Sequence, residues 1–245
     1  MPKSLSARIF VVLMILSGFL LLGEAIANAH KLPSARFLVL LVLATVAARL
    51  RVKLPGLTGV MSVNLPFILL AVALTGTAEA LTVAFISTFA QCLPRQKQKF
   101  NAVQIAFNCC ALTLAVGATR WIYFSPEFSS AISTPALRLA IAAAGYFLVN
   151  TAAVSLVITL TEAVNLLRTW AEIVQLSFPY LVASAGVAGL AIAVGQDIRW
   201  AVPVAVLPVM IGIFVSYRRF FTAATAQIAA ELSMEANNIA AAAHS

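Results

Sequence analysis

Apolar residues fill the chain in eight long stretches, and short segments between them carry most of the charged side chains. The stretches lack the regular polar alternation of membrane β-barrel strands. Most of them approach the ~20 residues that a helix needs to cross ~30 Å of hydrocarbon. The pattern predicts helices over residues 9–28, 33–52, 58–76, 78–93, 100–124, 137–160, 175–195 and 199–217.

The composition supports the same class, because 62% of the residues are hydrophobic, 10% are charged and the mean hydropathy is +1.00. Soluble domains have far more charged and polar residues than this. We therefore expect an all-α polytopic transmembrane helix bundle of about 8 spans over residues 1–219, embedded in the lipid bilayer. A short cytoplasmic helical tail over residues 220–245 follows, and its weak heptad pattern would allow a homodimer.

The distribution of Lys and Arg predicts the orientation. Of the 16 basic residues, eleven fall on one side of the predicted bundle and five on the other. Because cytoplasmic loops retain positive charge, both termini should face the cytoplasm of a bacterium, with the chain in its inner membrane. The net charge of +8 is then explained without nucleic acid, which we do not expect as a partner.

The first apolar stretch also has an alternative interpretation. Lys3 and Arg8 precede it, and residues 27–29 resemble a signal-peptidase site. Cleavage there would leave seven spans.

Two local patterns refine the bundle. Only residues 75–77 interrupt the apolar pattern between the third and fourth stretches, so these two should form a tight antiparallel helical hairpin. Before the seventh stretch, residues 166–174 place apolar side chains on one helical face and polar side chains on the other. This pattern predicts a separate helix that lies in the cytoplasmic interface of the membrane.

The reactive residue types do not combine into a catalytic centre. His30 and His244 are the only histidines, and no glycine-rich phosphate loop with its lysine is present. Cys92, Cys109 and Cys110 lie near predicted cytoplasmic helix ends, where we expect small core residues rather than disulfides. The sequence therefore indicates no enzyme, no metal site and no cofactor.

Polar side chains inside the predicted spans are the candidate ligand-binding residues, because unpaired amides are costly in lipid. Three of them share one face of the fifth stretch, which should point into the bundle. These residues either bond only to one another across helices or form a polar pocket for a small ligand in the cytoplasmic half. The candidates are Asn64, Gln91, Asn101, Gln104, Asn108, Asn150, Tyr180 and Ser184.

Several short motifs carry a resemblance to a known family. They are RLRVKLPGLTGVMSVN at 49–64, QCL at 91–93, VQIAFN at 103–108, SFPY at 177–180 and LPVM at 207–210. In this order the motifs resemble the N-terminal polytopic membrane module of bacterial GGDEF and HD-GYP signalling proteins, which is similar in kind to the MASE domains. The resemblance would cover about residues 36–220.

The resemblance implies a non-enzymatic sensory input module. Neither output motif follows residue 220, so a separate cytoplasmic output protein would be the partner. One alternative is a small-molecule transporter or a substrate-binding membrane subunit that resembles the S-components of vitamin uptake systems. Another is a scaffold subunit without a ligand, acting through the segment around Trp170 and the tail.

Overall fold

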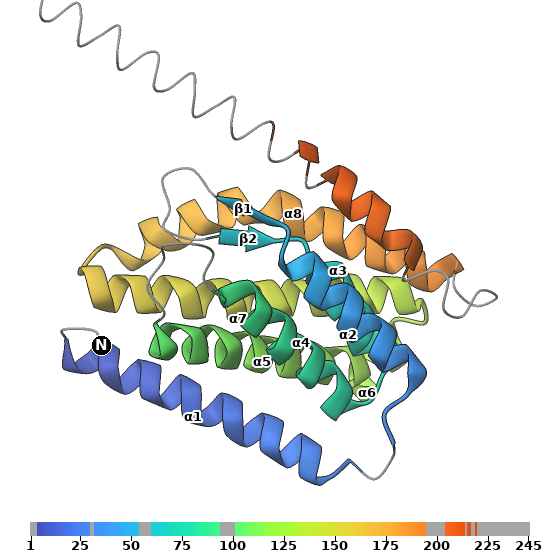
Figure 1. Cartoon of the computed structure of the whole chain (residues 1–245), viewed down its shortest axis with the longest axis horizontal. Helices are drawn as coiled ribbons and strands as arrows, with labels where there is room; N and C mark the ends of the chain where they lie inside the picture. The colour runs from blue at the N-terminus through green and yellow to red at the C-terminus, as the bar shows by residue number, and fades with distance from the viewer. Residues whose placement is uncertain are drawn as a thin grey trace, which may run out of the picture.

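The computed structural model describes residues 4–29, 32–53, 60–93, 101–194, 204–213, 215–216 and 219. In these ranges the chain forms a bundle of helices with one short β-hairpin (Figure 1). The predicted tail, residues 220–245, lies outside them. The helices are α1 Leu5–Ala27, α2 Ala35–Ala48, α3 Leu65–Leu74, α4 Thr77–Cys92, α5 Ala102–Phe124, α6 Pro126–Ala131, α7 Pro135–Glu162, α8 Leu166–Val194 and Val204–Ile213.

Four helices, α1, α5, α7 and α8, are long and apolar enough to cross a membrane by length and composition. Their axes run in similar directions in Figure 1. The multi-pass helical membrane class is therefore confirmed, but the predicted number of about 8 spans is not. The helices α2, α3 and Val204–Ile213 are apolar but short, and α3 has only 10 residues. A helix of that length covers ~15 Å, about half of the hydrocarbon thickness.

Two of the predicted helices were too long, because a β-hairpin lies between α2 and α3. Strand β1 (Arg51–Lys53) pairs antiparallel with β2 (Val60–Ser62), with Arg51 opposite Ser62 and Lys53 opposite Val60. The prediction of helix up to residue 52 and again from residue 58 is wrong at these ends. The β-branched Val52, Val60 and Val63 favour extended backbone here, and their hydrophobicity made the strands resemble parts of the helices.

The predicted interfacial helix is not a separate element. Residues 166–174 are the first part of α8, which runs unbroken for 29 residues with Pro179 inside it. Trp170 contacts α7, where its Nε1 donates to Thr151 Oγ1 at 3.1 Å, and Ile173 is buried. Part of the apolar face that suggested contact with lipid therefore packs against a neighbouring helix.

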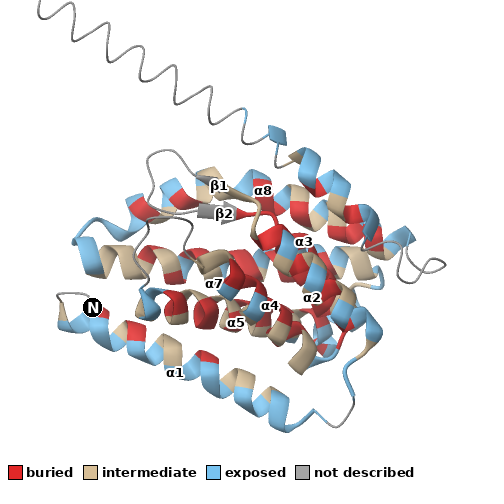
Figure 2. Ribbon diagram, in the orientation of Figure 1, coloured by how far each residue is buried: buried red, intermediate tan, exposed pale blue. Residues whose placement is uncertain are grey.

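The core of the bundle is centred on α3. Every residue from Leu65 to Val72 is buried, and α3 contacts α2, α4, α5, α7 and α8 (Figure 2). The predicted α3–α4 hairpin is confirmed, because α3 ends at Leu74 and α4 starts at Thr77 and runs back alongside it. At the edge of the bundle, α1 has only three buried residues, and the rest of its surface is half-buried or exposed (Figure 2).

A single glycine sets how closely α1 approaches α5. A Cβ atom added to Gly18 would lie 2.4 Å from Cβ of Cys110 and 2.7 Å from its Cα, so no side chain fits there without moving a helix. A Cβ atom added to Gly23, further along α1, would meet nothing within 4 Å.

We predict that Gly18→Ala destabilises the packing of α1 while Gly23→Ala does not. Both changes raise helix propensity by about 1 kcal/mol, but only the first forces backbone apart, at a cost of about 1–3 kcal/mol. Thermal unfolding of the two purified variants in detergent measures the difference. Equal melting temperatures would contradict the close approach of α1 and α5.

Candidate functional site

The first site surrounds the N-terminal end of α3, where backbone N–H groups need partners inside the bundle. The N–H of Leu65 donates to the hydroxyl of Tyr180 at 3.3 Å. Pro66 has no N–H, and the N–H groups of Phe67 and Ile68 reach the carbonyl of Asn64 at 3.1 and 3.2 Å. Every backbone donor of this first turn therefore has a partner, one of them supplied by the distant helix α8.

A cluster of hydroxyls and amides, here called the Asn64 cluster, lies beside this end. Ser62 Oγ is 2.8 Å from Asn64 Oδ1 and 2.8 Å from Gln91 Oε1, and Asn64 Nδ2 donates to Ser87 Oγ at 3.3 Å. A hydroxyl carries one proton, so it cannot donate to both amide oxygens at once. Turning the Gln91 amide over, so that its nitrogen donates to Ser62, satisfies both contacts. Ser62, Asn64 and Ser87 are buried.

Helix α8 carries two of the polar side chains predicted from the sequence. Tyr180 and Ser184 are one helical turn apart, and both are buried. Ser184 Oγ has no hydrogen-bond partner among the described residues. A buried hydroxyl without a partner costs about 1–3 kcal/mol, so this position favours the arrival of another polar group.

The other four predicted residues do not join the cluster. Asn101 caps the start of α5, where its Oδ1 accepts from the N–H of Gln104 at 3.3 Å, and both residues are exposed rather than facing the bundle interior. Asn108 is half-buried and donates to Cys92 Sγ at 3.5 Å. Asn150 is half-buried on α7 and forms no hydrogen bond with the cluster. The ligand-binding role of all eight residues stays a prediction.

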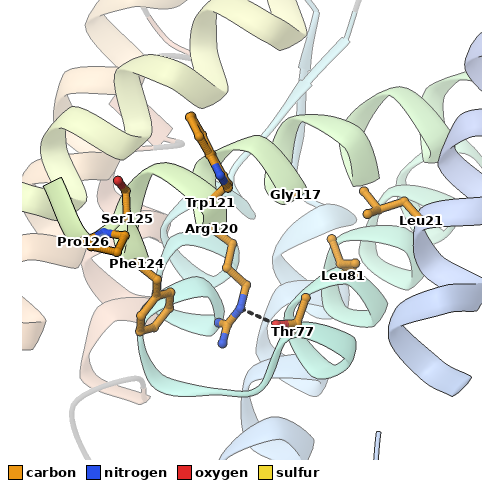
Figure 3. Close-up of a pocket in the computed structure, with 9 residues that line it drawn as sticks. All are labelled: Leu21, Thr77, Leu81, Gly117, Arg120, Trp121, Phe124, Ser125 and Pro126. Carbon is orange, nitrogen blue, oxygen red and sulfur yellow. Dashed lines mark hydrogen bonds between the residues drawn. The ribbon is translucent and has the colours of Figure 1, made fainter. Parts of the chain in front are cut away.

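Sequence reasoning missed the residue that completes the other end of α3. Arg120, in the last part of α5, donates through Nη1 to the carbonyls of Val72 at 2.7 Å and Thr75 at 2.8 Å. Its Nε donates to Thr77 Oγ1 at 2.8 Å (Figure 3), and its guanidinium lies 4.5 Å from the ring centroid of Phe124. The signal was available, because an arginine inside an apolar run is costly in lipid and normally faces protein groups.

Glu79 organises the same end of the bundle. Its two carboxylate oxygens accept from the backbone N–H groups of Ser34, at 2.7 Å, and of Gly76, at 2.8 Å. This carboxylate therefore joins the start of α2 to the start of α4.

Arg49 and Arg51 bind the backbone carbonyls at the last turn of α4. Each donates to the carbonyl of Ala90, at 2.9 and 3.2 Å, and Arg51 also donates to the carbonyl of Leu93 at 2.8 Å. Cations are favourable at this negative end of a helix.

An open groove of about 370 Å³ adjoins Arg120 between α1, α4 and α5 (Figure 3). Leu21, Leu81 and Gly117 form its apolar side, while Arg120 and Thr77 supply its polar groups.

Neither region contains residues for metal chemistry. Among the described residues, no three His, Cys, Asp or Glu side chains are close enough to hold a metal ion, and the three cysteines are free thiols. The groups that do meet are amides, hydroxyls, arginines and the Glu79 carboxylate, which interact through hydrogen bonds and charge.

No family model, curated protein or solved structure matches this chain. The resemblance to the sensory modules of GGDEF and HD-GYP signalling proteins is therefore not confirmed.

We predict that Tyr180→Phe lowers the free energy of unfolding by about 1–3 kcal/mol, because it leaves the buried N–H of Leu65 without an acceptor. Tyr123→Phe is the matched control, since Tyr123 is also buried but its hydroxyl bonds to no described residue. Thermal or denaturant unfolding in detergent compares the two. A cost for Tyr123→Phe as large as that for Tyr180→Phe would argue against the cap.

Proposed function

We propose that this chain is a non-enzymatic signal-input module of a bacterial cytoplasmic membrane, which binds a small polar ligand at the Asn64 cluster. The observation that carries the proposal is the position of Ser62, whose hydroxyl contacts both Asn64 and Gln91. Ser62 is the last residue of β2, so this one hydroxyl links the hairpin to both α3 and α4.

The cluster is well placed to move the hairpin. Only two residues separate the end of β2 from the start of α3, and Asn64 is one of them. A ligand that takes over a hydrogen bond of Asn64 or Gln91 would release Ser62 and change how β2 sits against α4. Because signalling needs a ligand with different affinities for two arrangements, this exchange of hydrogen bonds supplies a physical mechanism.

The chemistry of the cluster favours binding over catalysis. Asn64 uses one of its two Nδ2 hydrogens, toward Ser87, and Ser184 Oγ has no partner among the described residues. These groups can hold a ligand that carries an acceptor oxygen. Amides and hydroxyls without an adjacent base are poor general acids or nucleophiles at neutral pH.

The rest of the proposal follows the charge distribution and the motifs. Both termini lie in the cytoplasm, so the hairpin, next to the basic Arg49 and Arg51, faces the same side. A separate cytoplasmic output protein receives the signal there.

We predict that Ser62→Ala loosens the hairpin without unfolding the bundle. Hydrogen exchange of the backbone amides at residues 60–63 should accelerate about tenfold or more, because a link worth about 1–1.5 kcal/mol between β2 and α4 is lost. Ser129→Ala, in the exposed helix α6, is the control. If hydrogen exchange at residues 60–63 were unchanged in Ser62→Ala, the proposed coupling between the Asn64 cluster and the hairpin would be contradicted.

Ligand binding itself is tested with a library of small polar metabolites on the purified full chain. A true ligand should raise the melting temperature of the wild type and have little effect on Asn64→Leu. It should also change hydrogen exchange at residues 60–63. If the same compound is instead taken up by vesicles containing the protein, and not by empty vesicles, the chain is a transporter.

A further inference from the structure

The groove beside Arg120 contains polar and apolar side chains that have no role in the proposed function at the Asn64 cluster. It lies at the opposite end of α3, where the half-buried guanidinium of Arg120 forms its polar side. Nη1 and Nε of Arg120 bind two carbonyls and the Thr77 hydroxyl, whereas Nη2 bonds to none of the described residues.

The positive charge of Arg120 is only partly balanced, because Glu79 acts on it electrostatically without forming a direct ion pair. In the described part of the chain, Arg120 forms no ion pair, and Glu79 has both oxygens engaged by backbone N–H groups. A partly desolvated cation without a direct counter-charge favours an anion from outside the protein. Thr77 adds a second donor, because its hydroxyl accepts from Arg120 Nε and retains its own proton.

The remaining surface of the groove suits a hydrocarbon chain. Leu21 and Leu81 line it, and the lack of a side chain at Gly117 lets Leu21 pack closely against α5. A Cβ atom added to Gly117 would lie 2.7 Å from Cδ2 of Leu21 and 3.9 Å from Cδ2 of Leu81, so a larger residue would push Leu21 aside and block this part of the groove.

The position along α5 matches the level of lipid headgroups. Arg120 is followed by Trp121, which is 72% exposed, and Phe124, which is 50% exposed, close to the end of a helix long enough to span a membrane. Exposed aromatic residues near the ends of such helices mark the membrane–water interface, where phospholipid phosphates lie.

We propose that this groove is a binding site for one phospholipid molecule. The lipid phosphate accepts hydrogen bonds from Arg120 Nη2 and the Thr77 hydroxyl, and an acyl chain lies along Leu21 and Leu81 across Gly117. The site needs both parts, so neither a free phosphate ion nor an uncharged lipid binds equally well.

The test uses the full chain in a non-ionic detergent, titrated with dioctanoyl-phosphatidylglycerol. Lipid retention in native mass spectrometry and the shift in melting temperature report binding. The wild type should bind one lipid saturably. Arg120→Gln should weaken binding about tenfold or more, as expected for losing a charge-assisted hydrogen bond. Arg36→Gln removes one positive charge from an exposed position at the same end of the bundle and should leave binding unchanged.

Two further variants keep the test decisive if Arg120→Gln does not fold. Thr77→Val removes one donor, and Gly117→Leu fills the apolar part, while both keep the bonds from Arg120 to the carbonyls of α3. Each should weaken binding several-fold. Wild-type binding by both variants would overturn the proposal.

The two other probes separate the lipid from its parts. Dioctanoylglycerol lacks the phosphate and inorganic phosphate lacks the acyl chains, so each should bind at least about tenfold more weakly than the phospholipid. Equal binding of dioctanoylglycerol would show a merely apolar groove. Equal binding of phosphate would show a free-anion site. Either result would overturn the proposal.

Discussion

The shortness of α3 is the constraint on which the rest of this bundle depends. Leu65 to Val72 are all buried in the bundle, so the N–H groups at one end of this 10-residue helix and the C=O groups at the other need partners from neighbouring helices. Other helices supply the partners. Tyr180 from the middle of α8 binds the first turn, and Arg120 from α5 binds the carbonyls of Val72 and Thr75.

This constraint accounts for two of the groups of polar residues in this largely apolar chain. At one end of α3, hydroxyls and amides form the Asn64 cluster. At the other end, Arg120 and Glu79 tie together the ends of α2, α3, α4 and α5. Two polar atoms have no hydrogen-bond partner among the described residues, Ser184 Oγ on α8 and Nη2 of Arg120. The proposed ligand sites therefore use side chains that also stabilise the fold.

Most of the helical fold could be predicted from the sequence, because long apolar runs and polar breaks are local signals. The β-hairpin could not, since Val60 and Met61 are as hydrophobic as the helix that follows them. The side chains that cap the two ends of α3 could not be predicted either, because they come from distant parts of the sequence. The bond from Tyr180 to Leu65 joins residues 115 positions apart, and that from Arg120 to Val72 joins residues 48 apart. Of the eight candidate residues, Asn64 and Gln91 both contact Ser62, whereas Asn101 caps the exposed start of α5 by accepting from the N–H of Gln104.

The most direct test of this account compares two arginines by unfolding in detergent. Arg120 and Arg138 both lie over an aromatic ring, but only Arg120 binds the carbonyls of α3. Arg120→Gln should lower the free energy of unfolding by about 2–4 kcal/mol, because it leaves two buried acceptors without their charged donor. Arg138→Gln should cost less than about 1 kcal/mol, since its buried Nε has no partner to lose. Equal losses for both variants would contradict the central role of the α3 caps.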